Sequence, residues 1–86
     1  MKYLYKEIQT AGSDAIQVDL TGNAANVMVM DAINFSNYKA GRRYRYSGGH
    51  YSRSPAIINP PHAGRWFVIV DLGGLSGRVD ASIGII

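Results

Sequence analysis

The 86-residue sequence contains no cysteine and only two histidines, His50 and His62. The lack of cysteine excludes disulfides and thiolate metal sites, and the histidines have no acidic neighbours at a metal-ligand spacing. No apolar run approaches the ~20 residues of a membrane-spanning helix. The N-terminal residues MKYLYKEIQ lack the apolar stretch of a signal peptide. We therefore expect no metal, no cofactor and no membrane attachment, and a cytoplasmic location fits the absence of cysteine.

Acidic residues are absent from the whole middle of the chain. All six acids lie before Ala32 or after Val70. The middle carries six basic residues without an acid, namely Lys39, Arg42, Arg43, Arg45, Arg53 and Arg65. The middle thus has a charge of +6, whereas three basic residues and six acids leave the flanks at −3. This asymmetry indicates an anionic partner, unless folding places the flank acids beside the arginines.

The length predicts one domain over residues 1–86, and the apolar fraction of 47% is typical of a globular chain. Apolar residues alternate with polar ones through most of the sequence, which is the pattern of half-buried strands. Val79, Ala81, Ile83 and Ile85, for example, are expected to point inward. Turn-like clusters separate the segments, including Asn59–Gly64 and Gly73–Gly77. These features predict an all-β fold, an antiparallel β-sandwich of jelly-roll character with about seven or eight short strands.

Two predicted strands, Ala24–Asp31 and Arg65–Asp71, are apolar on both faces. An antiparallel sandwich normally leaves alternate positions wet, so this pattern favours an interface and hence a homo-oligomer. A small domain without disulfides also often gains stability by self-association. The segment Ala32–Gly41 has no period and is expected to form a loop or one short helical turn.

The stretch RRYRYSGGHYSRS, residues 42–54, alternates arginine with tyrosine around Gly48-Gly49. A double glycine suits a two-residue type I′ turn, so we predict a β-hairpin here. Successive strand residues point to opposite faces, which places tyrosines on one face and Arg43, Arg45 and His50 on the other. The tyrosines are expected to cover the core.

From this hairpin we infer a candidate anion-binding face. Guanidinium groups bind phosphates or carboxylates with paired hydrogen bonds. The face consists of Arg42, Arg43, Arg45 and His50, with Tyr38, Asn34 and Arg53 at its border. Two alternatives remain: nucleic-acid binding through the same residues, and sugar binding by Tyr44, Tyr46, Tyr51 or Trp66.

No residue pattern predicts catalysis. Serines lie near His50, but no acid is placed locally to orient the imidazole. The loop DLGGLSG lacks the lysine and the following helix of a phosphate-binding loop. Asp31, with Asn34 and Asn37 after it, has two interpretations, a ligand site or satisfaction of backbone groups in a tight loop. We expect a non-enzymatic interaction module.

The segment from Met30 to Gly74 resembles a bacterial family of small all-β domains of unknown function, found as single-domain proteins and attached to TIR domains. The resemblance lies in Met30-Asp31, the stretch NFSNY, Gly48-Gly49-His50, the stretch from Pro61 to Trp66, and the sequence DLGG. It implies a compact β domain of bacterial origin, and it supplies no catalytic residue or cofactor. Attachment to TIR domains would suggest a sensing or assembly role.

Overall fold

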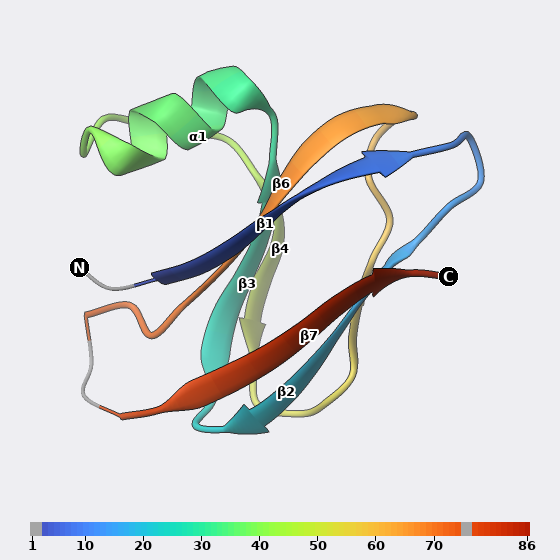
Figure 1. The fold of residues 1–86 in the computed structure, drawn as a ribbon. Helices are drawn as coiled ribbons and strands as arrows, with labels where there is room; N and C mark the ends of the chain where they lie inside the picture. The colour runs from blue at the N-terminus through green and yellow to red at the C-terminus, as the bar shows by residue number, and fades with distance from the viewer. Residues whose placement is uncertain (1–2, 75–76) are drawn as a thin grey trace.

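The computed structural model describes residues 3–74 and 77–86 of the chain (Figure 1). Within these ranges, seven strands and one helix follow in the order β1 (Tyr3–Thr10), β2 (Ile16–Gly22), β3 (Ala25–Met30), α1 (Ala32–Lys39), β4 (Ser47–Tyr51), β5 (Ala56–Ile58), β6 (Gly64–Asp71) and β7 (Val79–Ile85). Sheet A has the strand order β1-β6-β3-β4 and sheet B the order β5-β2-β7, and every pairing is antiparallel. The predicted all-β sandwich class is confirmed.

The main core lies between the two sheets. Alternate residues of β2 point inward, so that Ile16 and Val18 are completely buried. They meet the inner face of sheet A, where the buried side chains include Val27, Val29, Val68 and Val70. Burial of such aliphatic side chains contributes roughly 1.5–3 kcal/mol each, and this is the main source of stability for the sandwich.

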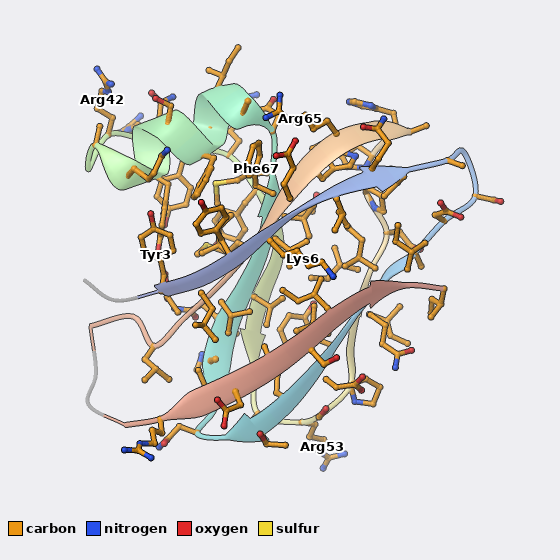
Figure 2. All side chains as sticks on the ribbon, in the orientation of Figure 1. Tyr3, Lys6, Arg42, Arg53, Arg65 and Phe67 are labelled. Atoms are coloured by element: carbon orange, nitrogen blue, oxygen red, sulfur yellow. The ribbon has the colours of Figure 1, made fainter. Side chains whose placement is uncertain are left out.

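A second core lies on the outer face of sheet A, beneath α1. Phe35 and Tyr38 of the helix cover a set of buried strand residues: Met28, Met30, Phe67 and Ile69. Figure 2 shows Phe67 and Tyr3 between the sheet and the helix. The two-faced apolar strands are thus covered by the chain's own helix. The pattern therefore gives no evidence for the interface that the sequence analysis inferred from it.

The segment after β3 is a helix of eight residues, longer than the predicted loop or single turn. Asp31 is its N-cap, and the carboxylate accepts a hydrogen bond of 2.8 Å from the backbone N–H of Asn34. Of the two interpretations of Asp31, the structure therefore supports satisfaction of backbone groups. The helix buries only Phe35 and Tyr38, so its apolar period was too weak to detect in the sequence.

The predicted hairpin turn at Gly48-Gly49 is wrong. Both glycines lie inside β4, where Gly48 pairs with Met28 and Gly49 with Val27 across the ladder. Gly48 has φ +122°, and a Cβ there would overlap the carbonyl oxygen of Val27. Gly48 therefore permits a close approach of two strands. Double glycine is compatible with both arrangements, which is why the sequence pattern was ambiguous.

The final strand follows the predicted alternation with one exception. Val79, Ala81 and Ile83 pack against the main core, whereas Ile85 is exposed. Of the predicted turn Gly73–Gly77, Leu75 and Ser76 lie outside the described residues.

Candidate functional site

Three arginines of the candidate site, Arg42, Arg43 and Arg45, lie on the segment that connects α1 to β4. All three side chains are exposed. The helix holds this segment at both of its ends, because the N–H of Arg42 donates to the carbonyl of Asn37 at 2.9 Å and the N–H of Arg45 donates to Oδ1 of Asn34 at 2.7 Å. The backbone is thus fixed while the guanidinium groups remain in solvent.

The three arginines of this segment form no ion pair with any described residue. Across residues 3–74 and 77–86, the one ion pair joins Arg65 to Glu7 on neighbouring strands. The N-cap carboxylate of Asp31 accepts from Asn34, and that of Asp71 accepts from Tyr38 and Asn26. Asp31 lies near Arg45, where both line one hollow, but in the described residues no flank acid forms an ion pair with Arg42, Arg43 or Arg45.

A hollow of about 300 Å³ opens beside Arg45. Its lining includes residues from three segments of the chain: Asp31 and Asn34; Arg45, Tyr46 and Ser47; and Pro61, His62 and Trp66. Tyr46 is half exposed, so its ring forms an accessible wall of the hollow. The sequence analysis assigned Asn34 and Arg45 to one site, and the structure brings these two together.

The contribution of His62 was not predicted. Its Nδ1 lies 2.8 Å from the carbonyl of Ala63, and its own carbonyl accepts a 3.0 Å bond from Nε1 of the buried Trp66. The exposed imidazole is therefore held at the rim of the hollow. The proximity of residues 61–66 to Arg45 could not be predicted from the sequence, because it depends on the pairing of β6 with β3.

The other predicted residues lie elsewhere. Arg53 follows β4 at the end of the molecule opposite to Arg42, as Figure 2 shows. His50 lies on β4, where its Nδ1 is 3.2 Å from Oδ1 of Asn26. Tyr38 is buried under the helix. The predicted single face of Arg43, Arg45 and His50 depended on the hairpin, and it does not exist in that form.

Tyr38 belongs instead to a hydrogen-bond network around Asp71, the buried carboxylate that ends β6. The Tyr38 hydroxyl donates to Oδ2 of Asp71 at 2.5 Å, while Nδ2 of Asn26 and the N–H of Gly73 donate to Oδ1, each at 2.9 Å. Burial and then the hydrogen bond to Asp71 raise the pKa of Tyr38 above its ordinary value. Burial, with the nearby charge of Asp71, also raises the pKa of Tyr44. The sequence analysis missed this network, although an aspartate that directly follows the apolar run WFVIV was a possible signal.

The network fastens the helix to the sheet. In the described part of the chain, no buried side-chain nitrogen or oxygen lacks a hydrogen-bond partner. Nor do three or more His, Asp or Glu side chains converge among the described residues in a group that could hold a metal.

A second hollow, of about 580 Å³, is lined in part by Tyr3, Asp71 and Arg78. Its carboxylate already accepts three hydrogen bonds from the protein. This hollow adjoins Gly77, next to residues that are not described. The arginine segment is therefore the better candidate for binding.

Fold and site together define a small all-β sandwich domain with an exposed arginine segment. The chain matches the family described as a domain of unknown function, DUF1883, over residues 1–86. It belongs to that family. Comparison with curated proteins and with solved structures gave no match. None of the described helices is long and apolar enough to cross a membrane.

Proposed function

We propose that this domain is a non-catalytic interaction module that binds an anionic ligand through Arg42, Arg43 and Arg45. The observation that carries the proposal is that, in the described structure, no carboxylate oxygen lies within 4.0 Å of the guanidinium nitrogens of these three residues, although the chain has six acids. Uncompensated arginines on one anchored segment attract phosphate or carboxylate groups, and guanidinium binds both with paired hydrogen bonds.

The hollow beside Arg45 supports the proposal, because it offers space for such a ligand next to a guanidinium group. Arg45 offers nitrogen donors at its rim, His62 contributes an exposed imidazole ring, and Tyr46 offers an exposed aromatic face. The carboxylate of Asp31 also lines the hollow, and its Oδ1 is engaged by the side chain and backbone of Asn34. A ligand with one anionic group and an uncharged remainder fits this mixture best.

Nucleic acid is the second candidate, supported by the exposed ring of Tyr46 next to Arg45, on which a base could stack. The sugar-binding alternative loses support. Trp66 is buried, Tyr51 packs against the main core and Tyr44 packs against the second core, so Tyr46 is the one ring of that set that is largely exposed.

The proposal includes self-association, for which the two-faced strands no longer provide an argument. A cytoplasmic location, a bacterial origin and attachment to TIR domains also belong to the proposal. They rest on the absence of cysteine and on the resemblance described above. A sensing or assembly role would use both ligand binding and self-association.

The test is a fluorescence-anisotropy titration with two probes, a labelled single-stranded oligonucleotide and a labelled polyglutamate peptide. We expect binding at low salt that weakens toward about 0.15 M ionic strength, because exposed charges are screened. For the oligonucleotide, the slope of log K against log salt should fall by about 0.7 for each phosphate contact removed. Arg42→Gln/Arg43→Gln and Arg45→Gln should both weaken binding.

The matched control is Arg53→Gln/Arg78→Gln, which also removes two positive charges, but from exposed arginines outside the segment. If the control weakens binding as much as the segment variant, binding depends on net charge and the proposed site is wrong. Binding of the oligonucleotide alone would select the nucleic-acid candidate. Failure of both probes at low salt would refute the proposal.

A further inference from the structure

The last strand of the chain, β7, is an edge strand whose outer side has no backbone partner in the described structure. It pairs with β2 on one side, and β1 of the other sheet lies nearest on its free side. Figure 1 shows β1 and β7 at the front of the molecule, with no element in front of either. An exposed edge strand is a ready site for pairing with another chain.

The hydrogen bonds to β2 fix which backbone groups of β7 point outward. Ala15 and Ile86 exchange both N–H···O bonds, at 3.1 and 2.9 Å, and the N–H of Asn23 donates to the carbonyl of Arg78 at 2.8 Å. The β2–β7 register is continuous between these points. Hydrogen-bonded and non-hydrogen-bonded pairs alternate in an antiparallel ladder. The even-numbered residues of β7 therefore bond to β2, and the odd-numbered ones point their N–H and C=O groups away from it: Val79, Ala81, Ile83 and Ile85.

One contact confirms this assignment. The Lys6 side chain reaches from β1 and donates to the carbonyl of Ile83 at 3.2 Å (Figure 2). Its ammonium stands where the N–H of a neighbouring strand would lie. The bond is exposed, so a backbone N–H can replace it while the lysine returns to water.

We propose that two copies of this chain associate by antiparallel pairing of β7 with β7 of the second copy. This surface would serve the self-association included in the proposed function, and it is separate from the arginine segment. When the two-fold axis passes at Ser82, all four outward-facing residues find partners. Val79 then pairs with Ile85 of the partner subunit, and Ala81 with Ile83 of the partner subunit, each pair in both directions.

The side chains are self-complementary in this register. On the face of sheet B that is turned toward the core, the side chain of the exposed Ile85 would meet that of the half-buried Val79 of the other copy. The two would form an apolar cross-strand pair. On the opposite face of sheet B, Ser82 would lie beside Ser82 of the second copy, and Asp80 beside Gly84 of the second copy. No like charges would therefore meet. If the axis is shifted by one residue in either direction, one of these four residues has no β7 residue of the second copy with which to exchange backbone hydrogen bonds. A second copy of the chain therefore fits this edge in one preferred register.

The experiment is sedimentation equilibrium on the full chain, with two variants that introduce opposite charges at the same position. Gly84 is exposed, and a Cβ there would meet no described atom within 4 Å, so both substitutions are compatible with the monomer fold. We expect the wild type to dimerise. Gly84→Asp, facing Asp80 of the other copy, should raise the dimer Kd, and Gly84→Lys should lower it, each by about 2- to 30-fold for two symmetric pairs.

Amide hydrogen exchange, followed by NMR, identifies the surface directly. In the dimer the N–H groups of Val79, Ala81, Ile83 and Ile85 should become protected as concentration rises, whereas those of Asp80, Ser82 and Gly84 should be protected at every concentration. A wild type that stays monomeric at submillimolar concentration overturns the proposal. A dimer in which the odd-numbered β7 amides stay unprotected also overturns it. So does a dimer whose Kd is unchanged in both Gly84 variants. Anion binding, measured separately, can succeed or fail independently of these results.

Discussion

At the scale of single residues, Asp71 decides how the helix is held. A buried carboxylate is unfavourable unless hydrogen bonds satisfy it, and three donors from different parts of the chain do so here. Tyr38 supplies the only bond to Oδ2 in the described structure, from a helix that the sequence pattern did not reveal. The role of Tyr38 is therefore structural, where the sequence suggested the border of a binding face.

We expect the stability of the protein to decline as pH rises above about 10, the ordinary pKa of tyrosine. The raised pKa of Tyr38 means that the folded state holds this proton more tightly than the unfolded state does. The contribution of Tyr38 is thus fully present below that pH and is lost at higher pH. Tyr38→Phe should remove this part of the pH dependence and lower the free energy of unfolding at pH 7 by about 1–3 kcal/mol, because Oδ2 loses its donor.

Urea unfolding at neutral and alkaline pH measures both effects. Tyr5→Phe is the control, since Tyr5 is 57% exposed and should behave as the wild type. Equal alkaline slopes for the wild type and Tyr38→Phe would show that the hydroxyl of Tyr38 is not buried against Asp71.

At the scale of elements, β4 and α1 show where sequence patterns mislead. The strands with clear alternation, such as Ile16–Gly22, and those with dense apolar composition, such as Gly64–Asp71, were predictable. The strand Ser47–Tyr51 contains two glycines, which local preference assigns to a turn. Only the approach of β3 makes it a strand. The residues assigned to the anion face consequently do not lie on one face of a hairpin, although Arg45 and Asn34 do meet.

The two glycines of β4 should differ sharply in their tolerance of alanine. Gly48→Ala places a methyl group against the carbonyl of Val27 at positive φ, so we expect a loss of at least about 2 kcal/mol in unfolding free energy. Gly49 lacks both constraints, and Gly49→Ala should change stability by less than about 1 kcal/mol. Urea midpoints of the two variants make the comparison, and similar losses would contradict the observed placement of β4.

At the scale of the whole molecule, strands β3 and β6 belong to two cores at once. Val27 and Val68 face the main core, while Met28 and Phe67 face the helix. The second core also contains a series of aromatic contacts, among them Phe35 stacked on Phe67 at 4.7 Å between ring centroids. Loss of either core removes one side of the same two strands, so the cores stabilise each other.

We therefore expect thermal and urea unfolding to occur in one cooperative transition. Fluorescence of Trp66 reports the main core, and near-UV circular dichroism of the tyrosines reports mainly the second core. The two signals should give the same midpoint, and Phe35→Ala should lower both together. Ile33→Ala is the control on the same helix, because Ile33 is 75% exposed. A tyrosine signal that is lost before the Trp66 signal would show that α1 is an independent, weakly attached element.

The sequence by itself determined the fold class, most of the strands and the uneven distribution of charge, because residue alternation and composition are local properties. Only the tertiary structure decided what covers the outer face of sheet A, since an eight-residue helix with two buried side chains carries almost no periodic signal. Tertiary structure also decided which arginines remain unpaired and which lie together, because those facts depend on contacts between distant segments. The same holds for the free edge of β7, whose outward-facing groups follow from the ladder with β2.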